Sequence, residues 1–155
     1  MDRRGLSRVA GLLLAAPLAM VARAPRAMAA PGHRIALHVG GGDPVQMAVA
    51  LHNIAAAADS YAAKGEPVAI ELVANGPGYT MLRADRSPVK DFLAETRKRY
   101  PFVVFAACQM SRKGIAAAEG KQPADIPELP GVTDVPSGIV RLVALQEQGW
   151  SYIRV

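Results

Sequence analysis

The chain has 155 residues, enough for one domain and too few for two of ordinary size. Its formal net charge is +5, but residues 1–30 hold five arginines against one acidic residue, so the remainder is close to neutral. That balance argues against nucleic-acid binding, which needs a basic face on the folded domain. The single cysteine, Cys108, excludes an internal disulfide, a zinc site built from several cysteines and the paired-cysteine motif of thioredoxins.

Residues 1–29 contain the three parts of a signal peptide. A basic start with Arg3 and Arg4 precedes an apolar stretch over 9–22, and Ala27-Met28-Ala29 puts small residues where a signal peptidase reads them. The twin arginine resembles a Tat signal, and a Sec signal has a similar apolar region. The stretch is shorter than the about 20 residues of a membrane-spanning helix. We expect cleavage after Ala29 and a periplasmic or secreted domain over 30–155 without a membrane span. The alternative is a cytoplasmic protein with a poorly ordered N-terminal helix.

The rest of the chain alternates between predicted strands and helices. Apolar runs predict strands over 34–39, 67–74, 102–108, 131–135 and 150–155. Helices are predicted over 44–63, 87–99, 109–118 and 139–148. This alternation implies a parallel sheet with helices on both faces. We therefore expect an α/β fold: a three-layer α/β/α Rossmann-like domain with a mainly parallel five-stranded sheet. The wholly apolar run 102–108 is typical of a central strand covered on both faces.

Helix starts carry local signals. Asp43 is a predicted N-cap with Pro44 at the first helical position, and Ser87 with Pro88 repeats the pattern. Gly40-Gly41-Gly42 precedes the first helix, but it lacks the lysine of a phosphate loop and the third glycine of a dinucleotide fingerprint. We expect no cofactor and no metal site.

Four polar positions follow predicted strands. His38, Asn75 with Gly76, Cys108 and Ser137 should share one edge, because the carboxyl ends of parallel strands point the same way. Only Cys108 also lies at a helix start, where the dipole and free N–H groups favour a reactive thiolate. Each residue has a structural alternative: a buried inert thiol for Cys108, a loop hydrogen bond for His38, a turn pair for Asn75-Gly76, and an N-cap for Ser137.

The mature chain resembles the DsrE/DsrF-like family of sulfur-relay proteins, in its single-domain exported branch. The motifs that carry the resemblance are LHVGGGDP (37–44), IELVANGPGYTML (70–82), FAAC (105–108) and LPGVTDVPSGIVRLVALQEQGWSYIRV (129–155). The family implies an α/β/α fold that assembles into trimers or hexamers. It also implies a cysteine after the third strand, matched by Cys108, that carries sulfur as a persulfide and passes it to a partner protein.

Three functions follow from these observations. The first is a sulfurtransferase-like sulfur carrier with Cys108 as the reacting residue and His38, Asn75, Gly76 and Ser137 as binding or orienting groups. The second is a non-catalytic oligomeric binding module in which Cys108 is buried. The third is a soft-metal Cu(I) site formed by Cys108 with His38 or Met110, since thiolate and thioether ligands suit that ion.

Overall fold

The computed structural model describes residues 32–155, so the predicted signal peptide lies outside the described residues. The strands are β1 (His33–Val39), β2 (Val68–Ala74), β3 (Val104–Cys108), β4 (Thr133–Val135) and β5 (Ser151–Arg154). The α-helices are α1 (Pro44–Ala63), α2 (Lys90–Arg99), α3 (Gln109–Ala118) and α4 (Gly138–Glu147), and the short 3₁₀ helices are η1 (Gly76–Leu82) and η2 (Pro123–Asp125).

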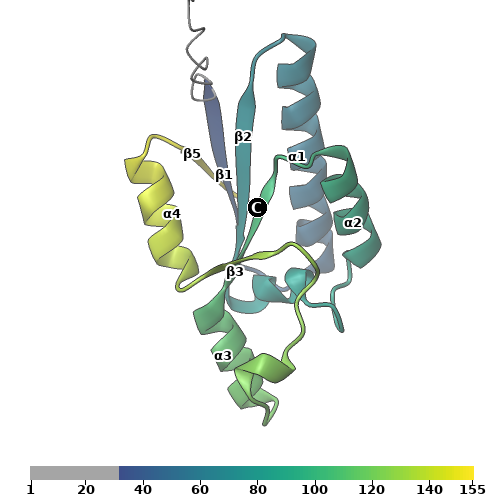
Figure 1. Ribbon diagram of the computed structural model, residues 1–155, viewed down its shortest axis with the longest axis vertical. Coiled ribbons are helices and arrows are strands. Elements are labelled where there is room, and N and C mark those ends of the chain that lie inside the picture. Colours follow the sequence, from purple (N-terminus) through teal and green to yellow (C-terminus); the bar gives the residue numbers. More distant parts are fainter. Residues whose placement is uncertain (1–31) are drawn as a thin grey trace, which may run out of the picture.

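The five strands form one sheet in the order β4-β3-β2-β1-β5, and every pairing is parallel. Helices α1 and α2 lie on one side of the sheet and α4 lies on the other, while α3 extends from the end of β3 (Figure 1). The prediction of a three-layer α/β/α, Rossmann-like domain is confirmed. Among residues 32–155, no helix has both the length and the apolar character needed to cross a membrane.

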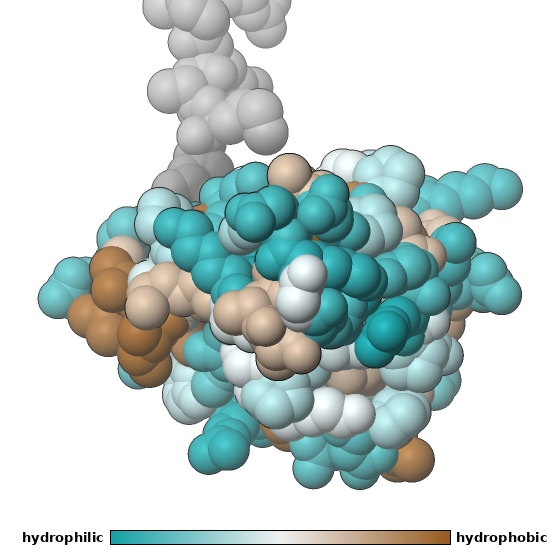
Figure 2. Space-filling view, turned by 90° about the horizontal axis from the view of Figure 1, so that it is seen from below, coloured by the Kyte–Doolittle hydropathy of each residue, from teal (hydrophilic) through white to brown (hydrophobic). Residues whose placement is uncertain are grey.

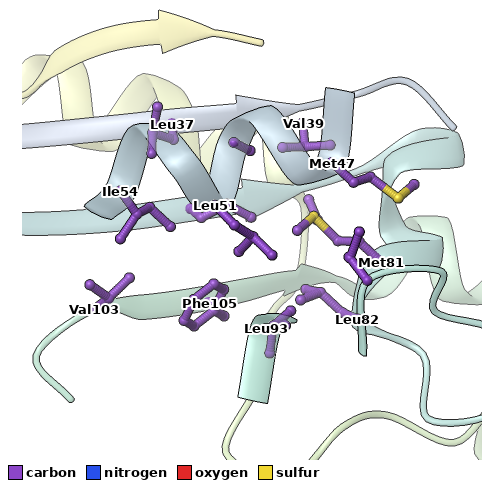
Figure 3. Packing of buried hydrophobic residues seen from close by; sticks show 14 of the residues in the cluster. Leu37, Val39, Met47, Leu51, Ile54, Met81, Leu82, Leu93, Val103 and Phe105 are labelled. Carbon is purple, nitrogen blue, oxygen red and sulfur yellow. The ribbon is translucent and has the colours of Figure 1, made fainter. Parts of the chain in front are cut away.

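The larger core fills the space between the sheet and the α1–α2 layer. Leu37 and Val39 of β1 lie over Leu51 and Ile54 of α1, with Phe105 of β3 across from them (Figure 3). Helix α1 begins as predicted: Asp43 is its N-cap, accepting a 2.9 Å hydrogen bond from the Val45 N–H, and Pro44 is its first residue. The alternating buried residues of the strands therefore hold the sheet against α1.

Helix α4 covers the opposite face over small side chains. Ala36, Val73 and Ala106 of three adjacent strands pack with Leu142 and Leu145 of the helix. Small sheet residues allow close approach, and this brings the first turn of α4 to the carboxyl edge of the sheet. An ion pair also holds the helix to the sheet: the partly exposed Arg141 donates two 2.6 Å hydrogen bonds to the buried Glu71 of β2.

Two predictions about local structure are wrong. The run 102–108 is not the central strand, because β2 takes that place and the observed β3 begins only at Val104. Val104 is 37% exposed and Phe102 is 47% exposed. The reason is that β4 pairs only from Ala106 onward, so the start of β3 has a neighbour on one side only.

The second error is the start of α2. Ser87 is not its N-cap, since the helix begins at Lys90 with Val89 in the capping position. The Ser87 hydroxyl donates to the Met81 carbonyl at 2.6 Å instead, which ties the turn to η1. Its oxygen also accepts a 3.4 Å hydrogen bond from the Val89 N–H, so Ser87 belongs to the turn before the helix and not to the helix cap.

Candidate functional site

The carboxyl edge of the sheet brings the predicted site residues together. His38 lies near the end of β1, Asn75 follows β2 directly, and Cys108 ends β3. The parallel register places these ends side by side. Ser137 and Gly138 follow β4 and begin α4 at the same edge. The expectation of a shared edge is met in the geometry.

Cys108 lies at the meeting point of two helix starts. It occupies the N-cap position of α3, with its backbone in an extended conformation. Its sulfur makes no side-chain capping hydrogen bond within residues 32–155, but the backbone N–H groups of Met110 and Ser111 in α3 and of Gly138 in α4 lower the pKa of its thiol. The residue is only 4% exposed. Free N–H groups at helix N-termini stabilise negative charge, so this is an environment suited to a thiolate.

The Ser111 hydroxyl also acts to lower the pKa of Cys108. Its Oγ accepts a 2.7 Å hydrogen bond from the Gly76 N–H, so the hydroxyl hydrogen is left for another acceptor. Gly76 adopts φ +51°, a left-handed conformation that glycine tolerates without strain. The predicted turn residue Gly76 therefore orients Ser111, and through it contributes to the sulfur site.

These contacts set the pKa of the thiol. Burial raises the pKa of Cys108 and is the largest single influence. The hydrogen bonds from the Ser111 hydroxyl and from the backbone of Gly138, Ser111 and Met110 act in the opposite direction, and together they hold the pKa below its ordinary value. The arrangement activates the sulfur through hydrogen-bond donors rather than through a neighbouring base.

His38 is not placed to act as that base. Its Nδ1 lies 2.7 Å from the Tyr152 hydroxyl and its Nε2 lies 2.9 Å from Asn75 Oδ1, so both ring nitrogens are occupied. An amide oxygen only accepts, so His38 Nε2 donates to Asn75 Oδ1. His38 orients Asn75 instead of receiving a proton from Cys108.

The backbone of Gly138 lies against the side chains of both Asn75 and Cys108. A Cβ atom at this position would lie 2.9 Å from the Asn75 Cβ and 3.2 Å from the Cys108 Cβ. Only glycine allows α4 to start so close to both side chains. Ser137 is the N-cap of α4 as predicted, but its side chain makes no capping hydrogen bond within residues 32–155.

The surface around Cys108 is apolar and shallowly grooved. One groove of about 440 Å³ runs between η1 and α3 and includes Gly76 and Ser111. Another of about 340 Å³ lies along the start of α4 and includes Ser137. Exposed apolar side chains occur in the first turns beside the cysteine, at Met110 of α3 and at Ile139 and Val140 of α4. Figure 2 shows an apolar patch on the α4 side, at the left of the view.

Three contributors to the site were missed in the sequence. Ser111 carried a usable signal, because the third residue of a helix commonly faces the N-cap side chain. Gly138 directly precedes the helix predicted over 139–148, and that place alone does not indicate a close approach to Cys108. Tyr152 had no signal of its own, since its contact with His38 depends on β5 pairing beside β1.

The described residues offer little to a metal ion. Across 32–155 no group of three or more His, Cys, Asp or Glu side chains is arranged to hold one. Of the two partners considered for a Cu(I) site with Cys108, His38 has both nitrogens engaged and Met110 projects into solvent with 65% exposure. Copper binding there would require the His38 hydrogen bonds to break.

The chain resembles a solved structure over most of its length. No family model matches the chain, and no curated protein does. The chain is similar to the solved structure of MTH1491 from Methanobacterium thermoautotrophicum, a protein of unknown function, at 30% identity and a TM-score of 0.62. The match covers 79% of this chain and 99% of that one.

Proposed function

Because the chain belongs to the same family as MTH1491, whose function is unknown, we propose a function from the site itself. The protein is a sulfur carrier that holds sulfane sulfur as a persulfide on Cys108 and passes it to a partner. The observation that carries this proposal is the position of Cys108, which is the N-cap of α3 and packs against Gly138, the first residue of α4. The lowered pKa of its thiol agrees with this position. It agrees with the DsrE/DsrF-like resemblance, which remains part of the proposal.

The chemistry balances without an outside oxidant. The Cys108 thiolate attacks the sulfane sulfur of thiosulfate, the S–S bond of the donor breaks, and sulfite leaves with the bonding electron pair. The product is a Cys108 persulfide anion. An acceptor thiolate then attacks the outer sulfur, and the Cys108 thiolate leaves. The donors that stabilise the thiolate act on the Cys108 sulfur before loading, and again when it leaves as a thiolate after the transfer.

We also propose where the protein acts and how it assembles. The signal-peptide pattern supports a periplasmic or secreted site of action, by the Tat or the Sec route. The exposed apolar residues of α4, Ile139, Val140 and Val143, support assembly into a homo-oligomer, a trimer or hexamer as in the DsrE/DsrF-like proteins. The same surface borders Cys108, so assembly would enclose the sulfur and protect it from oxidation.

A single-turnover experiment tests the reaction. Purified protein is mixed with thiosulfate, and released sulfite is measured against sulfur bound to protein. The proposal expects equal amounts of both, none with Cys108→Ser, and full release of the bound sulfur when a thiol acceptor is added. Sulfite release that persists in Cys108→Ser would refute it.

The burial of Cys108 favours one alternative, a non-catalytic oligomeric binding module. That function predicts slow labelling of Cys108 by a thiol reagent in the native protein and an unchanged assembly in Cys108→Ser. Labelling at the rate of a free thiolate, measured with iodoacetamide, would exclude the binding module.

A further inference from the structure

A chain of three side chains crosses the carboxyl edge of the sheet and ends beside Cys108. It starts at Tyr152 on the edge strand β5, passes through His38 on β1, and reaches Asn75 after β2. The two hydrogen bonds are 2.7 and 2.9 Å long. Gly40 packs against the second of them: a Cβ there would lie 3.1 Å from His38 Nε2 and 3.4 Å from Asn75 Oδ1.

The direction of these bonds determines how the Asn75 amide faces. Asn75 Oδ1 accepts from His38, so the amide nitrogen lies on the opposite side of the group. That side is toward Gly138, where a Cβ would lie 3.4 Å from Asn75 Nδ2 and 3.2 Å from the Cys108 Cβ. The Asn75 amide N–H₂ group and the Cys108 side chain thus both lie next to the Cα of Gly138, in the space that a side chain there would fill.

We propose that Asn75 donates a side-chain hydrogen bond to the sulfur carried on Cys108, and that His38 and Tyr152 are positioning residues that keep its amide nitrogen turned toward that sulfur. The inference rests on the proposed function, which it deepens by naming how the bound sulfur is held. The backbone donors and Ser111 serve the inner sulfur atom, and Asn75 serves the outer sulfur of the persulfide. Through the contact of Tyr152 with His38, strand β5 takes part in orienting Asn75.

The sharpest variant is Asn75→Asp. It keeps an oxygen to accept from His38 and replaces only the amide nitrogen by an oxygen that repels the sulfur anion. We expect the rate of sulfur loading to fall at least about tenfold, and the pH at which Cys108 becomes alkylated to rise, because a charge-assisted hydrogen bond is lost. Asn53→Asp makes the same change on the exposed face of α1, and should alter neither the rate of sulfur loading nor the pH at which Cys108 is alkylated.

Tyr152 is tested by a double-mutant cycle. Tyr152→Phe should slow sulfur loading about threefold alone and have no further effect in the Asn75→Ala background, because it acts through Asn75. Tyr61→Phe, on α1, is the matched control. If the loading rate of the double variant falls by the product of the two single losses, the positioning role of Tyr152 is refuted. The cycle still decides the inference if Asn75→Asp does not fold.

The outcomes separate this inference from the proposed function. If wild-type protein takes up no sulfur, the carrier function fails, and the alkylation profiles still report whether Asn75 faces the thiolate. If wild type loads sulfur and Asn75→Asp loads it at the same rate with the same alkylation profile, the function stands and the role of Asn75 is refuted.

Discussion

The Ser111 hydroxyl is the hydrogen-bond donor to Cys108 that can be removed most cleanly. Ser111→Ala removes the hydroxyl that lowers the pKa of the thiol, together with the acceptor of the Gly76 N–H, and leaves the backbone N–H groups of α3 and α4 in place. A hydrogen bond to a charged group contributes about 1.5–3 kcal/mol, and one pKa unit corresponds to about 1.4 kcal/mol. Cys108 is 4% exposed, so water cannot fully replace the hydroxyl. We therefore expect the pKa of the thiol to rise by about one unit or more.

The assay is the rate of iodoacetamide alkylation as a function of pH. Cys108 is the only cysteine, so the reaction reports one sulfur without interference. Below the thiol pKa, the rate in Ser111→Ala should be about tenfold lower than in wild type, because the thiolate fraction falls tenfold per pKa unit. Ser111→Thr, which keeps the hydroxyl, should restore most of the rate. Superimposable profiles for wild type and Ser111→Ala would refute this explanation of how the thiol is activated.

Three further predictions concern stability. Gly138→Ala forces a Cβ to 2.9 Å from the Asn75 Cβ, and should cost about 1–3 kcal/mol in urea unfolding and slow Cys108 alkylation. Gly114→Ala in α3 meets no atom within 4 Å, and should instead stabilise the protein, so equal effects would contradict the packing argument. Arg83→Met removes a guanidinium that is 2% exposed and pairs with Asp85 and Glu119. It should lower the free energy of unfolding by about 2–3 kcal/mol in the same assay. The loss is smaller than for a wholly buried pair because Asp85 is one-third exposed. Asp134 has an exposed side chain, but partial desolvation and the neighbouring Glu128 carboxyl raise its pKa, so the stabilising contribution of this carboxyl exists below its unfolded pKa and is lost as the pH rises through its folded pKa. Asp134→Asn should therefore raise the unfolding free energy at pH 7 more than at pH 3, and a gain independent of pH would contradict this assignment.

The parallel sheet was predictable because local signals agreed along the chain. Apolar runs alternated with capped helices, and the ends of such strands must share an edge, which placed His38, Asn75 and Cys108 together. The order of the strands was not predictable in the same way. The apolar run at 102–108 looked like a central strand, but its position depends on how far β4 pairs, which no local pattern records.

The detailed chemistry of the site depends on distances between segments far apart in the sequence. Gly138 matters because α4 approaches closely over small sheet residues, and Tyr152 matters because β5 lies beside β1. Ser111 is the exception, since its spacing of three residues from a helix-capping cysteine is a local pattern. A search for hydroxyl side chains at that spacing would have found it.

The central claim is that Cys108 carries sulfur as a persulfide. Its most direct test is the intact mass of the native protein after incubation with thiosulfate or polysulfide, followed by peptide mapping. We predict a mass gain of one or more sulfur atoms located on the peptide that contains Cys108, lost on treatment with a thiol reductant and absent in Cys108→Ser. A wild-type protein that gains no sulfur while its Cys108 remains open to alkylation would contradict the claim.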